Sequence, residues 1–220
     1  LCPLSYKHDI NIEKFINPEI QKKSAIGFFK TRNLLDGFYI HFLSPDRGIV
    51  IYTPVILFGF LGLLILHKKN QTILSLFFAI IGTNILLYSM WGDPYGGWAF
   101  GSRYLIPSFA LLSIVISLLL SKWRAKSFLL IIFFLIISYS IAVNSLGAIT
   151  TSRIPPKIEA IPLSQLSGKV EKYSWDRNVE YLLDGNSKSF IYQTYVYKYL
   201  ASWQYFLLIT SMIVGVSGLL

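Results

Sequence analysis

A polar stretch between two long apolar runs, WGDPYGGWAFGSRY at residues 91–104, holds the residue types best suited to binding chemistry. It contains four glycines, an aspartate and an arginine among aromatic rings. Glycines let the backbone approach a ligand closely, an arginine donates in a planar fork that suits phosphate or carboxylate, and aromatic rings offer flat faces for stacking. The stretch therefore predicts a site for a phosphate-bearing ligand that also contains a ring.

Two charged residues outside this stretch are further candidates. The segment SPDRG, residues 44–48, directly precedes an apolar run, so Ser44 or Asp46 is predicted to cap the helix that begins there. A cation at a helix N-terminus opposes the helix dipole. Arg47 is therefore expected to pair with Asp46, with a lipid headgroup or with an anionic ligand.

A plainer interpretation of the stretch needs no ligand. Tryptophans at a membrane interface and an arginine that reaches toward water would explain Trp91, Trp98 and Arg103 one by one. This alternative stays open, but it accounts poorly for four glycines placed together with Asp93 and Arg103.

The composition indicates a membrane protein. The chain has 220 residues, of which 54% are hydrophobic, and a mean hydropathy of +0.54. Several apolar windows approach the length of about 20 residues that a helix needs to cross a bilayer. Because lipid leaves backbone groups without water, such windows must be helical. We predict an all-α, polytopic helical membrane protein with about five spans, at Ile49–His67, Thr72–Trp91, Tyr104–Ser121, Phe128–Gly147 and Trp203–Leu220.

The charges of the loops predict the orientation of these spans. Residues 67–71 and 121–127 contain cations and no acid, so the positive-inside rule makes both loops cytoplasmic. Alternation then places residues 1–48, 91–103 and 148–202 on the extracytoplasmic side. Residues 49–147 form a four-helix transmembrane region in this scheme, and residues 203–220 form the fifth helix.

The two longer outer segments have their own patterns. Residues 24–44 mix aromatic and charged residues at helical spacings, which predicts an interfacial helix within 1–48 or a loop packed on the bundle. In 148–202, the prolines at 155, 156 and 162 predict an extended start, and a short helix is expected near Ser174. The aromatic residues at 192–205 predict a belt at the membrane interface, with a sugar-stacking surface as the alternative.

The ends of the chain also raise an expectation. The chain starts at Leu1 rather than at a methionine, and it stops inside an apolar run. We expect it to be a piece of a longer protein.

Two stretches resemble a known family: FLSPDRGIVIYTPVILFGFLGL at residues 42–63 and YSMWGDPYGGWAFGSRYLIPSFALL at residues 88–112. Both look like the later transmembrane region of polytopic GT-C-type glycosyltransferases of prokaryotes, a group similar to protein O-mannosyltransferases and lipid A aminoarabinose transferases. The resemblance covers residues 42–121, about a third of the chain, and lies in sequence texture more than in a strict catalytic motif. It implies an integral protein of a prokaryotic cell membrane that transfers a sugar from a polyprenyl-phosphate donor on the extracytoplasmic face.

The resemblance also implies roles for the candidate residues. Arg47 and Arg103 would neutralise charge on the leaving phosphate. The family's catalytic acid usually lies in the first extracytoplasmic loop, which would precede Leu1, so Asp93 is the substitute expected to deprotonate the acceptor. The other predicted members of the donor site are Asp46, Tyr95, Gly96, Gly97, Trp98 and Tyr104.

The same residues bear on partners and cofactors. Cations spread over both faces disfavour nucleic acid as a partner, which leaves the lipid-linked sugar and membrane lipids. The spacing of the histidines and the single cysteine predicts no metal site or other cofactor. A divalent cation stays open because Asp46 and Asp93 fall on the same predicted side.

Two other functions remain alternatives. A transporter or flippase subunit would use polar residues inside its spans, for which Asn84, Ser140 and Asn144 are the candidates. Ion coupling is disfavoured because no charged residue lies well inside a span. A non-catalytic membrane scaffold would act through residues 148–202.

Overall fold

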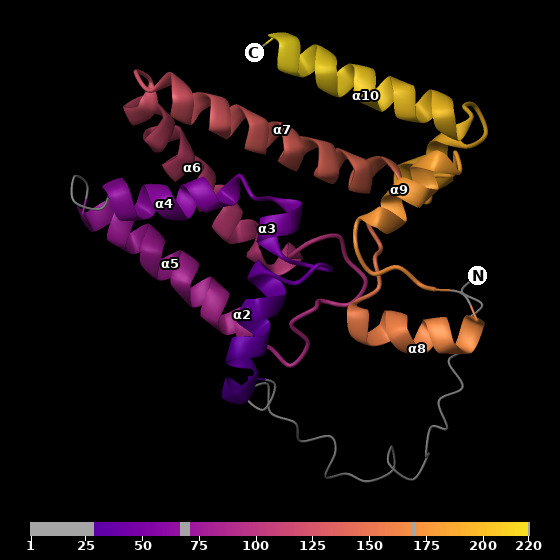
Figure 1. Cartoon of the computed structure of the whole chain (residues 1–220), viewed down its shortest axis with the longest axis horizontal. Coiled ribbons are helices and arrows are strands. Elements are labelled where there is room, and N and C mark those ends of the chain that lie inside the picture. Colours follow the sequence, from indigo (N-terminus) through magenta and orange to yellow (C-terminus); the bar gives the residue numbers. More distant parts are fainter. Residues whose placement is uncertain (1–28, 67–70, 169, 220) are drawn as a thin grey trace.

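The computed structural model describes residues 29–66, 71–168 and 170–219, and every regular element within these ranges is helical (Figure 1). Three helical stretches are long and apolar enough to cross a membrane by length and composition: Gln71–Ser89, Arg103–Trp123 and Ser127–Ile149. They correspond to α5 (Gln71–Ser89), to η4 (Arg103–Leu105) with α6 (Ile106–Trp123), and to α7 (Ser127–Ile149). The all-α class is confirmed for the described residues, and three of the predicted spans coincide with helices that are long and apolar enough to cross a membrane.

The first predicted span is not one continuous helix. It consists of α3 (Ile49–Tyr52) and α4 (Ile56–Leu66), separated at Thr53, whose φ of −146° and ψ of 54° are not helical. Pro54 explains this break, because proline lacks an N–H and disfavours the helical region in the residue before it. The last window is covered by α10 (Ser202–Leu219). That either of these two windows crosses a membrane stays a prediction.

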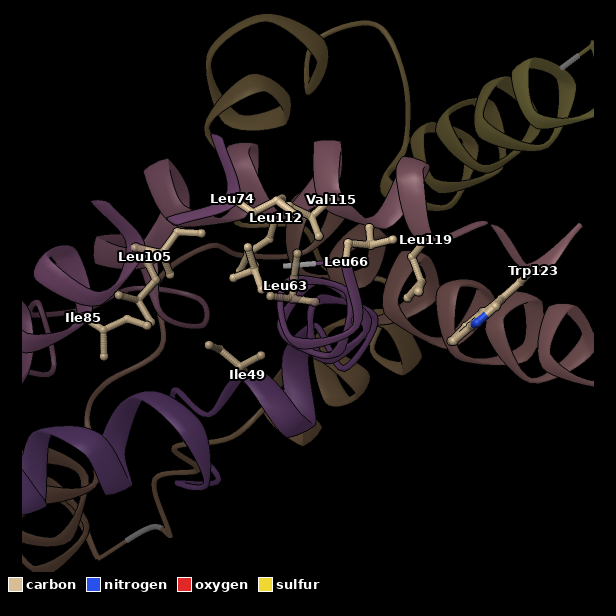
Figure 2. Close-up of a cluster of buried hydrophobic side chains, with 12 residues drawn as sticks. Ile49, Leu63, Leu66, Leu74, Ile85, Leu105, Leu112, Val115, Leu119 and Trp123 are labelled. Carbon is tan, nitrogen blue, oxygen red and sulfur yellow. The ribbon is translucent and has the colours of Figure 1, made fainter. Parts of the chain in front are cut away.

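The packed centre of the described helices lies between α4 and α6. Gly59 and Gly62 sit on the face of α4 that meets α6, where an added Cβ would come within 2.7 Å of Leu112 Cβ and of Val115 Cγ1, respectively. Small residues at such positions let two apolar helices approach closely. Figure 2 shows the side chains that surround this contact, among them Ile49, Leu63, Leu66, Leu112, Val115 and Leu119.

A short helix at the start of the described residues packs beside α5. This helix, α2 (Leu34–Phe42), follows η3 (Thr31–Asn33). Gly37 presses against the backbone of Ser89, and a Cβ there would lie 2.1 Å from Ser89 O. The predicted segment 1–48 therefore does contain a helix. Residues 1–28 of it, and residues 67–70 of the predicted cytoplasmic loop, lie outside the described residues.

The segment after α7 forms α8 (Lys157–Ser167), α9 (Asp176–Leu183) and a π-helical turn, η5 (Tyr192–Val196). The short helix expected near Ser174 is confirmed by α9. The extended start holds only up to Pro156: residues 151–156 are not helical, and Pro156 has extended backbone angles (φ −66°, ψ 153°). The prediction fails at Pro162, which lies inside α8. Two of the three prolines precede the helix, where a missing N–H costs nothing.

Three segments meet at one end of the bundle, around the magenta loop between α5 and α6 in Figure 1. They are residues 43–48, the loop 91–103 and residues 150–156. A backbone hydrogen bond of 3.2 Å from Ala99 N–H to Ile154 O joins the last two. The segments predicted to share the extracytoplasmic side therefore lie together; which side of a membrane this end faces stays a prediction.

Candidate functional site

The loop 91–103 takes the tight turns that its glycines were predicted to allow. Gly96, Gly97 and Gly101 have φ values of 70°, 65° and 67°, in the left-handed region that other residues rarely adopt. Asp93 Oδ2 accepts a hydrogen bond of 3.1 Å from Gly97 N–H, which closes the first turn. The loop is a shaped structure rather than a plain connection.

Arg47 lies beneath this loop, only 1% exposed. Its Nε donates to Tyr95 O at 3.0 Å and its Nη2 donates to Gly97 O at 2.7 Å. The remaining bonds run from Nη2 to Ile154 O at 3.0 Å and from Nη1 to Asp46 O at 2.7 Å. Burial lowers the pKa of the guanidinium, and the adjacent Asp46 carboxylate offsets part of that effect.

These bonds define what Arg47 can do. An arginine side chain has five N–H groups, and four of those of Arg47 are committed to main-chain carbonyls. One Nη1 hydrogen is left for the donor phosphate that Arg47 was predicted to bind. The described contacts make Arg47 the residue that holds the loop in shape.

Asp46 is fully buried and caps a helix distant in sequence. Its Oδ2 accepts a hydrogen bond of 3.0 Å from the backbone N–H of Lys157, the first residue of α8, and the Ser44 hydroxyl donates to its Oδ1. The expectation that Ser44 or Asp46 caps the next helix was wrong, because α3 begins after Gly48 without a side-chain cap. The carboxylate instead meets the N-terminal dipole of α8.

Asp93 and Arg103 are both exposed on the loop. Arg103 opens η4, and its guanidinium carbon lies 5.5 Å from the centre of the Tyr104 ring. That ring stacks on Tyr88, with centroids 4.5 Å apart and planes 5° from parallel. In the described part of the chain, no acidic side chain lies within ion-pair distance of Arg103, so its donors are available to an anion.

Several of the other predicted site residues lie close to Arg103 and Tyr104. A Cβ added to Gly96 would lie 3.1 Å from Arg103 Nε and 3.1 Å from Tyr104 Cε2, so the glycine backbone packs directly against both side chains. Tyr95 is half-buried and supplies one of the carbonyls that Arg47 binds. Trp98 differs, because its Nε1 donates at 2.5 Å to Glu159 of α8, away from Arg103.

The pair formed by His41 and Ser102 was not predicted from the sequence. His41 Nδ1 and Ser102 Oγ are hydrogen-bonded at 2.6 Å, and the imidazole is 1% exposed. Burial lowers the pKa of His41, so its ring is neutral at neutral pH. The two residues are 61 positions apart, and the bond fastens α2 to the end of the loop.

A pocket of about 390 Å³ beside Trp98 was also missed. Its walls come from the loop 91–103, the residues after α7, the helix α9, and the chain from residue 188 into η5. We call it the cation pocket, after its cationic and aromatic lining residues Trp98, Arg153, Arg177, Tyr181, Lys188 and Phe190. These residues are scattered over residues 98–190, so only the fold could bring them together.

Asp46 and Asp93 are the acidic residues that the sequence analysis considered as possible ligands of a divalent cation. Within the described ranges, no group of three His, Cys, Asp or Glu side chains could hold a metal ion. Both carboxylate oxygens of Asp46 are engaged by Ser44 and Lys157. A cation shared by Asp46 and Asp93 stays a prediction.

Replacing Gly97 by alanine tests how far the loop depends on its left-handed turns. An added Cβ meets no atom within 4 Å, so the cost is that of the positive φ alone, about 1–2 kcal/mol. We expect the thermal unfolding midpoint of the detergent-solubilised protein to fall by a few degrees. Gly82→Ala on α5 is the matched control, because its Cβ also meets open space but its backbone is helical. Equal shifts in both variants would contradict the expectation.

Comparison with known proteins assigns no family to this chain. No protein-family model matches it, and neither the search of curated proteins nor that of solved structures found a significant match.

Proposed function

We propose that this chain belongs to an integral membrane glycosyltransferase that transfers a sugar from a polyprenyl-phosphate donor on the extracytoplasmic face. The position of Arg103 carries the proposal. This residue is exposed and begins a 21-residue helical stretch that is apolar enough to cross a membrane. A cation at the end of such a helix lies at the depth of lipid headgroups and of a lipid-linked phosphate.

The surroundings of Arg103 suit it to this role. Gly96 leaves room beside Arg103 Nε, and the stacked rings of Tyr88 and Tyr104 fix the wall on which the guanidinium lies. Arg47 and the glycine turns hold the backbone of the loop before any ligand arrives. Preorganised donors of this kind stabilise a developing negative charge more strongly than mobile ones.

The proposed reaction is an inverting transfer. The acceptor hydroxyl oxygen forms a bond to the anomeric carbon of the sugar while the bond from that carbon to the phosphate oxygen breaks. Polyprenyl phosphate leaves with the electron pair, and Arg103 neutralises its charge. The hydroxyl proton passes to a carboxylate, for which we propose Asp93: one of its oxygens is bonded to Gly97 N–H, and its other oxygen makes no hydrogen bond within the described residues.

Two variants of the loop separate donor binding from proton transfer. Arg103→Ala is expected to weaken binding of a polyprenyl-phosphate sugar by about 1.5–3 kcal/mol, the range for a hydrogen bond to a charged group. Asp93→Asn is expected to leave donor binding unchanged and to lower turnover by about a hundredfold or more. Both are measured on the full-length protein in detergent, with donor binding and sugar transfer recorded separately.

Arg124→Ala is the matched control for this pair. Arg124 is also exposed and lies just past the opposite end of α6. It is expected to leave donor binding unchanged. If the wild type binds no polyprenyl-phosphate sugar, the proposal is wrong, and a scaffold without lipid-sugar binding becomes the better interpretation.

Among the residues that the structure describes, no observation favours the transport alternative. Its polar residues inside the spans are bonded to neighbouring helices: Ser108 Oγ donates to Asn84 Oδ1 at 2.6 Å, and Asn144 Nδ2 donates to Tyr52 O at 2.8 Å. Ser140 Oγ accepts from Val55 N–H at 3.3 Å. Such bonds hold helices together in apolar surroundings.

A further inference from the structure

The cation pocket lies on the same loop as Arg103 but is a separate site. Trp98 is its contribution from the loop, while Asp93 and Arg103 are not among its lining residues. The other walls come from residues of the segment 148–202, which has no role in the donor binding and proton transfer proposed above. Its volume of about 390 Å³ falls within the range of pockets that hold small molecules.

The charge of the pocket selects an anion. Arg153, Arg177 and Lys188 line it, and no aspartate or glutamate does. Glu171 pairs with Arg177 Nη2 at 2.6 Å and so offsets one of the three cations. Arg153 and Lys188 are exposed, and no ion pair is formed by either within the described residues. Two uncompensated cations therefore face the same space.

The aromatic residues give the pocket a second chemistry. Arg177 lies over the rings of Trp98 and Tyr181, at 5.6 and 5.8 Å, and Lys188 lies 4.9 Å from the centre of the Tyr181 ring. The bond from Trp98 Nε1 to Glu159 fixes the indole, which stays 42% exposed. A fixed, partly exposed aromatic face suits a ligand that is itself a ring with an apolar face.

We infer that the cation pocket binds a saccharide that carries a phosphate or carboxylate group. The anion lies between Arg153 and Lys188, and the sugar ring packs on the Trp98 indole. The choice of a sugar over other small anions rests on the proposed glycosyltransferase function. If that function holds, the saccharide bound in this pocket is the acceptor of the transfer. The charge and the aromatic faces come from the pocket alone.

The test is calorimetric titration of the detergent-solubilised full-length protein with water-soluble probes. Glucose 1-phosphate and glucuronate are expected to bind, and glucose and inorganic phosphate are expected to bind at least about tenfold more weakly, because each lacks one of the two contacts. Arg153→Gln and Lys188→Gln are each expected to weaken the anionic sugars by about tenfold or more. Neither side chain forms a hydrogen bond or ion pair within the described residues, so both variants are expected to fold.

Lys198→Gln is the matched control, because Lys198 is exposed and follows the lining residue Gln193 by five positions in sequence, but is not itself a lining residue. An equal loss of binding in Lys198→Gln would overturn the inference, as would inorganic phosphate binding as tightly as glucose 1-phosphate. Vesicles of phosphatidylglycerol and of phosphatidylcholine test the lipid source of phosphate. If Arg153→Gln lowers association with the anionic vesicles while the sugars do not bind, the pocket recognises a lipid headgroup and the inference is wrong.

These results are independent of the test of the proposed function. The probes contain no polyprenyl chain, and the variants leave Arg103 and Asp93 intact. Anionic-sugar binding without any polyprenyl-phosphate binding would retain the pocket as a saccharide site and reject the transferase. If the polyprenyl-phosphate donor binds but the anionic sugars do not, the pocket is not a saccharide site and the proposed transferase function still stands.

Discussion

Replacing Arg47 by alanine is expected to lower the free energy of unfolding by at least about 3 kcal/mol, because each buried carbonyl left without a donor costs about 1–3 kcal/mol. The carbonyls of Asp46, Tyr95 and Gly97 lose this donor at once, while Ile154 O keeps its bond from Ala99 N–H. Thermal unfolding of the detergent-solubilised protein, followed by tryptophan fluorescence, measures the effect.

Arg47→Lys refines this prediction. Lysine keeps the positive charge but cannot donate in several fixed directions from one plane, so we expect it to recover little of the lost stability. Arg124→Ala, at an exposed arginine, is expected to leave the unfolding midpoint unchanged. A midpoint of Arg47→Ala equal to that of Arg124→Ala would mean that the buried hydrogen bonds contribute nothing.

Gly37→Ala is expected to cost about 3 kcal/mol, at the upper end of the range for overpacking. The added Cβ would lie 2.1 Å from Ser89 O, 2.5 Å from Ser89 Cα and 2.6 Å from Ser89 C. All three are backbone atoms at the end of α5, so no side-chain rotation relieves the overlap. α2 has to move away from α5, and His41, four residues farther along α2, moves with it.

The displacement of His41 gives this prediction a second readout. The hydrogen bond between His41 and Ser102 joins α2 to the loop 91–103. The variant is therefore expected to loosen the loop and weaken donor binding besides lowering stability. Gly82→Ala is the matched control on α5, where the same substitution meets open space and improves helix propensity. If Gly37→Ala were as stable as Gly82→Ala, α2 would not pack on Ser89 as described.

The parts of this fold that follow from local sequence could be predicted. α5, α6 and α7 correspond to long apolar windows, because a run of that length has few other structures available in lipid. The positive φ values of Gly96, Gly97 and Gly101 agree with the glycine-rich composition of the loop, since glycine adopts them without steric cost. The break at Thr53 agrees with the proline that follows it.

The parts of the fold that depend on contacts between distant residues could not be predicted from the sequence. Asp46 was expected to cap the next helix because its sequence neighbours suggested that, yet its partner is Lys157, 111 positions away. The start of α8 was missed for the same reason. Its first backbone N–H, at Lys157, donates to Asp46, and nothing in the sequence around its prolines indicates this distant partner. The cation pocket is the extreme case, because Arg153, Arg177 and Lys188 each look like ordinary surface cations until the fold places them together.

The contacts of Asp46 and Arg47 impose an order on the assembly of the chain. Arg47 binds Ile154 O, 107 positions away, and α5, α6 and α7 all lie between the two residues. A growing chain must complete all three helices before this bond can form, whereas the bonds of Arg47 to Tyr95 O and Gly97 O need only the chain up to residue 97. The loop 91–103 therefore reaches its final shape late in biogenesis. A nascent chain arrested within α7 would already carry Asp93 and Arg103, but the loop and Arg47 would still lack their bonds to Ile154 O.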